Sequence, residues 1–518
     1  MLSVSLYSRR SVMKGVAGSA LAIPALLTGD PIEQDVVRLD VEHQIIDNFG
    51  ASDCWSMQML GGWSLETRTR VADLLFSQTN GIGLSCWRFN IGGGINPRIT
   101  NRWRTAETFE TGPRQYDWTR QRNERWFLAA AKARGVPQFL AFVNSPPGRM
   151  TKNGLTFCDP EGSTTNLKAG AEGEYARYLG DILEHFYTNR DEAERIAFNY
   201  ISPVNEPQWD WAGHSQEGNR ASNDDIKRII RAVAAELQRR RLPTQIAALE
   251  SGSLPDMWQP NAKASARWGA QYGNYLEAFL NDTSVNGMLS GRIGYHSYGS
   301  DLLSGPLVNN RTQLREKIKQ YPSWKLWMTE YCVLVGSEGK GGDHRDLTMK
   351  TALDVARVIH LDLTLCGVSA WQWWTAVSGV DYKDGLIYTD WKKPGDEETI
   401  YPARLLWVLG NYSRFVRPGM QRVEIEGANH NIRGLMGSAF KNENSGRVAV
   451  VYINMQEQSR RVNLVFKTAA GARDAVSLTP YVTSNTAGDE LKPYPRVGPD
   501  SAVEIPGRSV VTVVAEFT

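Results

Sequence analysis

Eight short apolar runs, separated by segments with helical periodicity, dominate residues 45–374 and restrict the folds open to this chain. Each run ends in a polar or small residue, and together they are Ile45–Cys54, Ile82–Asn90, Gln138–Asn144, Phe198–Asn205, Gln245–Glu250, Arg292–Tyr298, Lys325–Glu330 and Gly367–Trp374. Eight strands that alternate with helices are typical of a closed parallel (β/α)8 barrel, because each helix covers the outside of the sheet. The sequence therefore predicts an α/β fold of the (β/α)8 TIM barrel type.

Three segments between these runs predict amphipathic helices. Trp118–Arg134, Tyr175–Phe186 and Asp224–Arg241 carry apolar residues three or four positions apart, which places them on one face of a helix. Asn223 is placed to cap the third of these helices. A doubly wound open sheet is the competing fold, but it usually has a glycine-rich phosphate turn after its first strand, and none is found here.

The composition changes near residue 415. All 17 tryptophans lie between Trp55 and Trp407, and short β-rich runs follow, such as Arg447–Ile453 and Ser509–Val514. These runs, with turn residues between them, predict a C-terminal β-sandwich. We expect four parts: a signal segment at 1–29, a strand segment at 30–48 that joins the sandwich, the barrel at 49–414 and the sandwich at 415–518.

The N-terminal segment has the features of an export signal. Arg9 and Arg10 precede an apolar stretch, Val16–Leu27, that is too short to cross a bilayer as a helix. The arginine pair predicts the twin-arginine route and a periplasmic or extracellular location. An N-terminus that merely contains two arginines is the alternative. No later run is long enough to span a membrane.

Charge and ligand-type residues argue against several classes of function. With 58 basic and 56 acidic residues, the net charge of +2 gives no field to hold nucleic acid. The seven histidines lack metal-ligand spacing and the five cysteines form no C-x-x-C pair, so we expect no metal, cofactor or disulfide framework. A single Cys54–Cys86 bridge remains open. We expect a monomer.

Two glutamates follow predicted strands in a pattern that points to catalysis. Glu206 ends the fourth strand within Val204-Asn205-Glu206-Pro207, and Glu330 ends the seventh. Active sites of such barrels lie at the C-terminal strand ends, where the fourth and seventh strands face each other. One protonated and one ionised carboxyl are the groups needed to cleave a glycosidic bond. Glu250, which ends the fifth strand, could be a substrate ligand or a supporting partner, and salt bridges are the structural alternative for all three.

The chain resembles glycoside hydrolase family 30, a family of retaining (β/α)8 enzymes. The matching stretches, one for nearly every strand and one for the last helix, are Asp47–Ser52, Trp87–Gly92, Asn144–Pro147, Val204–Pro207, Tyr295–Tyr298, Met328–Glu330, Trp371–Trp374 and Leu409–Gly419. The resemblance implies that Glu206 is the general acid/base and Glu330 the nucleophile, with carboxyl groups about 5 Å apart. It also implies hydrogen bonds from Arg88 and Tyr298 to Glu330, and a contact between Asn205 and the sugar 2-hydroxyl.

Further residues are expected to bind the sugar. Aromatic rings stack on pyranose faces, and six tryptophans lie at strand ends or in the loops after them: Trp55, Trp209, Trp211, Trp371, Trp373 and Trp374. Trp374 must point away from Trp371 and Trp373 on its strand. Asn144 follows the third strand. For His296, a supporting position behind the glutamates and a purely structural role are both open.

Several loop sequences are most similar to the endo-β-1,6-galactanase branch of the family. These are Asn144–Pro147, Met150–Thr151, Asn153–Gly154, Asn166–Lys168 and Gln216–Gly218. Gly148-Arg149 departs from that branch, because relatives commonly carry an aromatic residue there. Arg149 could meet an acidic substituent or be a solvated charge. The expected partner is an oligo- or polysaccharide. Activity on β-1,6-glucan, xylan, glucosylceramide or β-fucosides is the alternative, as is a non-catalytic carbohydrate-binding protein.

Overall fold

The computed structural model describes residues 32–517, apart from 160–161, 392–397 and 428–430. The export signal expected at 1–29 lies outside the described residues. Within the described ranges, every helix is too short or too polar to cross a membrane.

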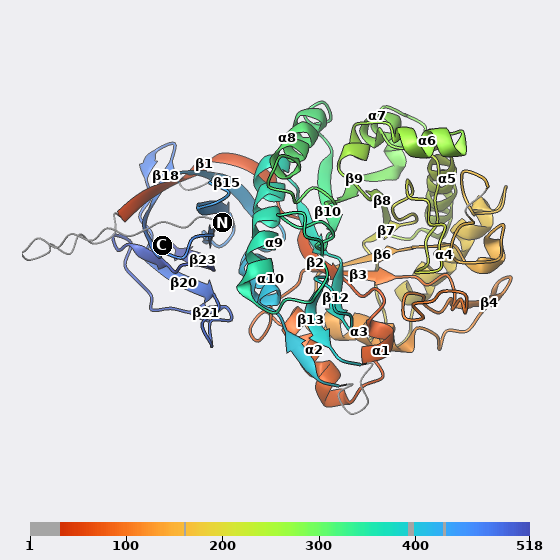
Figure 1. The fold of residues 1–518 in the computed structure, drawn as a ribbon, viewed down its shortest axis with the longest axis horizontal. Coiled ribbons are helices and arrows are strands. Elements are labelled where there is room, and N and C mark those ends of the chain that lie inside the picture. The colour runs from red at the N-terminus through yellow and green to blue at the C-terminus, as the bar shows by residue number, and fades with distance from the viewer. Residues whose placement is uncertain (1–31, 160–161, 392–397, 428–430, 518) are drawn as a thin grey trace, which may run out of the picture. The chain divides into compact units, whose positions relative to one another are not determined.

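A closed barrel of eight parallel strands forms the first part of the fold (Figure 1). Its strands are β2 (Asn48–Ser52), β3 (Cys86–Asn90), β6 (Gln138–Phe142), β7 (Tyr200–Ser202), β8 (Gln245–Ser251), β9 (Leu289–His296), β10 (Lys325–Glu330) and β11 (Ala370–Trp373). The barrel closes where β11 pairs with β2. One strand lies in or overlaps each of the eight predicted runs, so the predicted fold class is confirmed. Because the strands are parallel, their C-terminal ends open on one rim.

Helices follow most of the strands and cover the barrel. They are α1 (Met57–Leu60), α2 (Leu65–Phe76), α3 (Arg122–Ala133), α4 (Glu172–Tyr187), α5 (Asn223–Arg240), α6 (Ala262–Trp268), α7 (Tyr275–Leu280), α8 (Pro306–Ile318), α9 (Met349–Leu361) and α10 (Arg404–Ser413). The three predicted amphipathic helices correspond to α3, α4 and α5. The predicted cap of α5 was wrong: Ser222, not Asn223, caps it, in a reciprocal pair of hydrogen bonds with Asp225.

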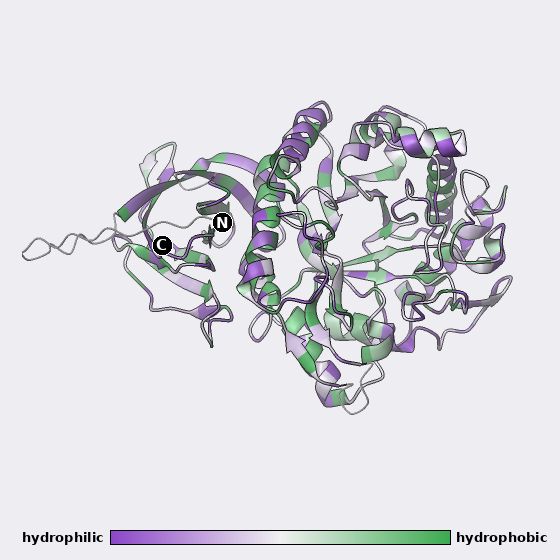
Figure 2. Cartoon of the chain, viewed as in Figure 1, coloured by the Kyte–Doolittle hydropathy of each residue, from purple (hydrophilic) through white to green (hydrophobic). Residues whose placement is uncertain are grey.

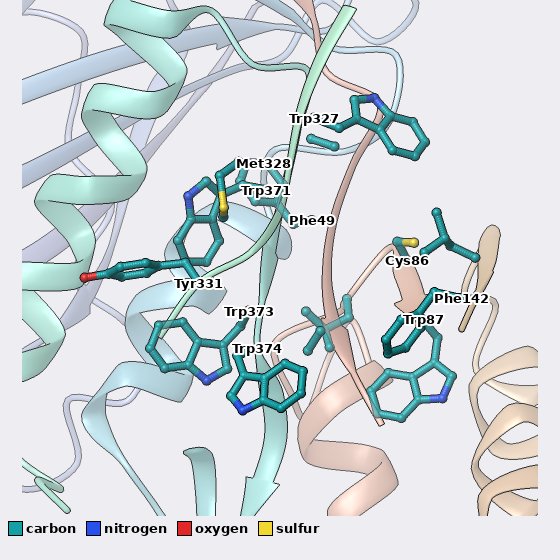
Figure 3. Packing of buried hydrophobic residues seen from close by; sticks show 14 of the residues in the cluster. Phe49, Cys86, Trp87, Phe142, Trp327, Met328, Tyr331, Trp371, Trp373 and Trp374 are labelled. Carbon is teal, nitrogen blue, oxygen red and sulfur yellow. The ribbon is translucent and has the colours of Figure 1, made fainter. Parts of the chain in front are cut away.

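Large side chains fill the barrel and the layer between strands and helices (Figure 3). Trp87, Trp327 and Trp371 are among the fully buried ones. Buried indole nitrogens need partners, and Nε1 of Trp327 donates to Oδ2 of Asp47 at 2.9 Å. In Figure 2, α8 shows a mostly hydrophilic visible side, whereas α9 carries hydrophobic residues along its length. The reason is that α9 contacts other elements on nearly all sides, as the burial of eleven of its thirteen residues shows.

The second part is a ten-stranded sheet built from both ends of the described chain. It contains β1 (Ile32–Ile45), β15 (Gln421–Glu426), β16 (Leu435–Lys441), β17 (Val448–Asn454), β18 (Arg460–Thr468), β19 (Gly471–Ala472), β20 (Ser477–Thr483), β21 (Lys492–Pro493), β22 (Val503–Ile505) and β23 (Ser509–Glu516). β1 lies between β15, to which it is antiparallel, and β18, to which it is parallel. The sheet folds around its own core, to which Val37, Val450 and Val513 belong.

The same sheet packs against the barrel through its other face. Val451 on β17 and Val514 on β23 belong to the barrel core rather than to the core of the sheet. α9 contacts both strands, and α10 contacts β23 and β20. Asn411 of α10 donates from Nδ2 to the carbonyl of Tyr481 at 3.0 Å and accepts at its own carbonyl from Oγ1 of Thr512 at 2.6 Å. Burial on both faces explains why residues 448–453 are apolar without alternation.

Smaller elements decorate the barrel. β4 (Glu110–Gly112) and β5 (Gln115–Tyr116) form a hairpin, and β12 (Thr375–Ser378), β13 (Gly385–Thr389) and β14 (Ile400–Pro402) form a three-stranded sheet after β11. All five cysteines are free and buried, so the Cys54–Cys86 bridge left open by the sequence is not formed.

Candidate active site

Glu206 and Glu330 lie together at the C-terminal rim of the barrel. Glu330 is the last residue of β10, and Glu206 follows β7 with a φ of 42°, a left-handed conformation that is costly for a glutamate. The Glu206 amide donates to the carbonyl of Glu250 at 2.9 Å, which helps to hold that turn. One carboxylate oxygen of each glutamate and one ring nitrogen of His296 all lie within 4.8 Å of one another.

Two donors hold the carboxylate of Glu330. Arg88 Nη1 lies 2.5 Å from Oε2, and the Tyr298 hydroxyl donates to Oε1 at 2.9 Å. Burial raises the pKa of Glu330, while the charges of His296 and Arg88 oppose that rise. Charge-assisted hydrogen bonds of this kind favour the ionised form and fix the direction in which the oxygens point.

His296 is fully buried between the glutamates. Its Nδ1 lies 2.9 Å from Oε1 of Glu206, and its Nε2 lies 3.1 Å from Oε2 of Glu250. Burial alone would lower its pKa, but the charge of Glu330 and the hydrogen bonds with Glu206 and Glu250 raise the pKa of His296 to about 9. At neutral pH the ring is therefore an imidazolium that donates from both nitrogens. The structure places His296 in the supporting position that the sequence left open.

Glu250 is a buried anchor behind the two catalytic candidates. Its Oε1 accepts from the Ser202 hydroxyl at 2.6 Å, and its Oε2 accepts from Thr329 at 2.7 Å and from Arg88 Nη2 at 3.2 Å. Burial opposes ionisation, but the positive charge of Arg88 and the hydrogen bond from His296 outweigh it and lower the pKa of Glu250 to about 2. Glu250 is fully buried and contacts both Arg88 and His296. Of the two roles left open by the sequence, substrate ligand and supporting partner, the structure favours the supporting partner.

A directional chain of side-chain amides runs beneath the site. Arg88 Nη2 donates to Asn205 at 3.0 Å, Asn205 to Asn144 at 3.1 Å, Asn144 to Asn90 at 3.1 Å, and Asn90 to Oε1 of Glu217 at 3.1 Å. A guanidinium can only donate, so the Arg88 end sets the orientation of every amide that follows, and the chain ends on an oxygen of Glu217. Asn205 is thereby held with both amide atoms engaged.

Glu217 is the acceptor end of this chain, and the sequence analysis did not place it in the site. It is fully buried and also accepts from Trp55 Nε1 at 2.7 Å. Burial raises the pKa of Glu217 to about 7, against the hydrogen bonds from Trp55 and Asn90. Sequence reasoning found only a loop similarity at Gln216–Gly218, because the partners of this carboxylate lie more than a hundred residues earlier in the chain.

A cavity of about 450 Å³ opens onto the two glutamates. Its lining includes eight of the expected site residues, namely Asn144, Asn205, Glu206, Trp209, Trp211, Tyr298, Glu330 and Trp374. It also includes residues that the sequence analysis did not assign to the site, among them Arg104, Asp384 and Leu334. The catalytic candidates thus share one solvent-connected space large enough for a sugar ring.

The expected tryptophans divide between this cavity and the core. Trp374 lines the cavity, and Trp55 packs edge-on against it with ring centroids 5.5 Å apart. Trp371 and Trp373 are fully buried and do not line the cavity; their indole nitrogens donate to Asp362 Oδ2 at 3.0 Å and to the Asp384 carbonyl at 2.6 Å. The alternation along β11 puts them on the opposite side from Trp374, so they support the rim and do not offer a stacking surface (Figure 3).

Asp384 and Arg104 bring opposite charges to the cavity wall. Burial raises the pKa of Asp384 to about 6, and its Oδ1 has no hydrogen-bond partner among the described residues. Arg104 donates from Nη1 to Gln216 at 3.0 Å. Neither residue lies at the end of a barrel strand or in a periodic segment, so the sequence analysis did not identify them.

Arg149 does not offer a free charge to the cavity. Its guanidinium binds both carboxylate oxygens of Glu110 at 2.9 Å and Oε1 of Glu174 at 2.6 Å. These ion pairs argue against recognition of an acidic substituent, and the charge of Arg149 is paired within the fold rather than solvated as the other alternative expected.

Comparison with known proteins identifies the family. The profile of O-Glycosyl hydrolase family 30 matches residues 33–388, most of the chain. The chain belongs to this family. As a family 30 member it is a glycoside hydrolase, and its substrate is a glycoside.

Relatives of this family 30 enzyme have several activities. An endo-beta-1,6-galactanase of Hypocrea rufa is 24% identical over 479 residues, covering 86% of this chain and 88% of the relative. The crystal structure of a conserved exported protein from Bacteroides fragilis matches with a TM-score of 0.82 and 28% identity, covering 93% of this chain and all of that one. The catalytic domain of a family 30 xylanase C from Talaromyces cellulolyticus matches with a TM-score of 0.66 and 22% identity, at 93% and 100% coverage.

Proposed function

We propose that this enzyme cleaves β-glycosidic bonds with retention of configuration, through a covalent intermediate on Glu330. The observation that carries the proposal is the short separation of the two carboxyl groups, whose nearest oxygens lie within 4.8 Å. Retaining enzymes hold their carboxyl groups about 5 Å apart, whereas inverting enzymes need roughly 6.5–9.5 Å to admit a water molecule.

In the first step, Glu206 gives its proton to the glycosidic oxygen while the Glu330 carboxylate attacks the anomeric carbon. The bond to the leaving sugar breaks and an ester to Glu330 forms. In the second step, Glu206 takes a proton from water, which attacks the same carbon and releases the product and the free carboxylate. Tyr298 and Arg88 hold the attacking carboxylate, and Asn205 lines the cavity where a 2-hydroxyl would bind.

The buried charges support these roles. Three carboxylates, those of Glu206, Glu250 and Glu330, share two cationic partners, Arg88 and His296. A proton on one of the three carboxylates leaves two negative and two positive charges, so that no buried charge is uncompensated. Glu250 and Glu330 both bind Arg88, whereas Glu206 contacts His296, so we assign the proton-donor role to Glu206.

As the substrate we propose β-1,6-galactan, cut within the chain. Support comes from the similarity to the Hypocrea rufa endo-beta-1,6-galactanase over most of both chains and from the loop sequences shared with that branch. Xylan and β-1,6-glucan are the competing substrates, because structural neighbours include family 30 xylanases and an endo-β1,6-glucanase.

We also propose that the protein is exported by the twin-arginine route. Arg9 and Arg10 before the apolar stretch 16–27 carry this proposal. Cell fractionation followed by N-terminal sequencing tests it. Replacing both arginines with lysine should keep the precursor in the cytoplasm, and unchanged export of that variant would contradict the route.

The central experiment is a product profile on β-1,6-galactan, β-1,6-glucan and glucuronoxylan, with the anomeric configuration of the first products followed by NMR. Release of β-configured galacto-oligosaccharides from galactan alone is the expected result. First products of α-configuration would contradict retention, and cleavage of only another polymer would contradict the galactan proposal.

A substitution of Glu330 separates turnover from substrate binding. Glu330→Gln should lose at least about a thousandfold in kcat and still bind the oligosaccharide, because the amide keeps the shape but cannot attack. A binding protein without catalysis would show no turnover in either form.

A further inference from the structure

One tryptophan differs from all the others in its exposure. Trp209, three residues after Glu206, is 43% exposed and lines the catalytic cavity, whereas the other sixteen are buried or half-buried. Leaving a large apolar ring in water costs free energy that burial would recover. An exposed ring beside a catalytic acid therefore needs an explanation.

The loop that carries Trp209 is firmly anchored. The Trp209 amide donates to the carbonyl of Glu206 at 3.1 Å, and Trp211 Nε1 donates to the same carbonyl at 2.9 Å. The carboxylate of Asp210 binds Arg220 at 2.8 Å and Arg267 at 2.6 Å. The neighbours of Trp209 are thus fixed on both sides, and its ring is exposed on a preformed loop.

The indole also lies close to the acid/base carboxyl. A Cβ atom placed on Gly252 would lie 2.1 Å from Trp209 Nε1 and 2.9 Å from Glu206 Oε1. Both atoms therefore border the same small space, which is kept open by the absence of a side chain on Gly252. The ring stands beside the oxygen that must reach the glycosidic bond.

From this geometry we infer that Trp209 forms the binding site for the leaving-group sugar, the first sugar on the reducing side of the cleaved bond. The inference rests on the proposed roles of Glu206 and Glu330. The acid protonates the leaving oxygen, so the sugar attached to that oxygen must lie on the side of Glu206, away from Glu330. The C–H face of a pyranose can then cover the exposed indole.

Binding at this position has a kinetic signature. Contacts to a sugar that departs in the first step help only substrates that carry that sugar. A glycosyl fluoride has no leaving sugar and needs little help from the acid, so it reports on the rest of the site. Comparing an oligosaccharide with the matching fluoride isolates the contribution of Trp209.

The test compares β-1,6-galactotetraose with β-1,6-galactobiosyl fluoride for the wild type, Trp209→Ala and Trp209→Phe. Trp209→Ala should lower kcat/KM for the tetraose about tenfold to a hundredfold and for the fluoride less than about threefold. Trp209→Phe should recover most of the loss, because a smaller ring still stacks. Leu65→Ala, at a site remote in the fold and 64% exposed, is the control for surface truncation.

Equal losses on both substrates, or no loss on the tetraose, would overturn the inference. If the substrate proposal is wrong, the wild type should instead cleave a xylo- or gluco-oligosaccharide. The losses in kcat/KM are then compared between that oligosaccharide and its matching fluoride. A wild type that turns over none of the pairs would contradict the proposed function itself, and with it this binding site.

Discussion

Nδ1 of His296 lies 2.9 Å from Oε1 of Glu206, and this contact joins the acid/base candidate to a buried cation. The other nitrogen of the ring lies 3.1 Å from Glu250 Oε2, so the ring cannot turn without breaking a second contact. The acid/base candidate is therefore held by a fully buried ring, which a fully buried carboxylate holds in turn.

His296 should make stability depend on pH on the alkaline side. Its pKa rises from 6.5 to about 9 on folding, so its contribution is fully present below about pH 6.5 and is lost as the pH rises through about 9. Chemical denaturation of the wild type between these limits should show a loss of up to about 3 kcal/mol in unfolding free energy. His296→Gln should flatten that dependence, and a variant with the slope of the wild type would contradict the assignment.

Tyr298 should set the acid limb of the rate profile. The nucleophile must be ionised, and burial raises the pKa of Glu330, so kcat/KM should rise with pH through a value above that of an ordinary glutamate. Tyr298→Phe removes a donor that favours the ionised form. It should move this limb to higher pH and lower kcat/KM about tenfold to a hundredfold. A limb displaced to lower pH would argue against Glu330 as the nucleophile.

Glu250 should matter more for stability than any exposed glutamate. Glu250→Gln leaves Arg88 and His296 with one fewer buried partner and should destabilise the protein by about 3–5 kcal/mol at neutral pH. The pKa of Glu250 falls from 4.5 to about 2 on folding, so its stabilisation is present above pH 4.5 and disappears as the pH falls through about 2. The gap between wild type and variant should close over that range. Glu316→Gln, on the surface of α8, is the matched control, and an equal cost for both would refute the role of Glu250.

Glu217 should act on the substrate through Asn205. Glu217→Ala removes the acceptor that binds Asn90 and Trp55, so the amide chain that positions Asn205 loses the partner at its far end. We expect kcat/KM to fall about tenfold for an aryl glycoside with a 2-hydroxyl and clearly less for its 2-deoxy analogue. Equal losses on both would indicate a general packing defect and not a positioning role.

Arg149→Gln should leave catalysis nearly unchanged. The charge of Arg149 is already bound by Glu110 and Glu174. We expect a stability loss of about 1–3 kcal/mol, because the buried Glu110 carboxylate loses its guanidinium partner, and a change in kcat/KM within about twofold, also on substrates that carry uronic acid. A selective loss on the acidic substrates would restore the alternative in which Arg149 recognises an acidic group.

Much of the fold was predictable from the sequence because strand ends in this architecture have a recognisable chemistry. The eight apolar runs located the barrel strands, and the shift in composition located the C-terminal sheet. Glu206 and Glu330 could be found because both follow a buried strand within distinctive neighbours. The cap of α5 was misplaced by one residue, since Ser222 and Asn223 are equally good capping residues.

The supporting residues were harder to predict for a physical reason. Glu250 lies one residue before the end of β8, much as Glu330 ends β10, and only its partners from β3, β7, β9 and β10 show that it is an anchor. Glu217 lies in a loop without periodicity. Alternation along the strand predicted that Trp374 points away from Trp371 and Trp373. It could not predict which of the two sides faces the cavity.

The position of β1 also determines when the β domain can fold during synthesis. Arg38 on this strand binds Glu426 on β15, 388 residues later, so β1 is synthesised long before its partner strand. Until that strand is made, both edges of β1 are unpaired, which is a known route to aggregation. A fragment that ends after the barrel therefore leaves an open strand at its N-terminus, and a fragment that starts at the barrel leaves a gap in the sheet between β15 and β18. The catalytic barrel is in this sense an insertion into the β domain, and neither part can be expressed alone without exposing a sheet edge that the intact chain covers.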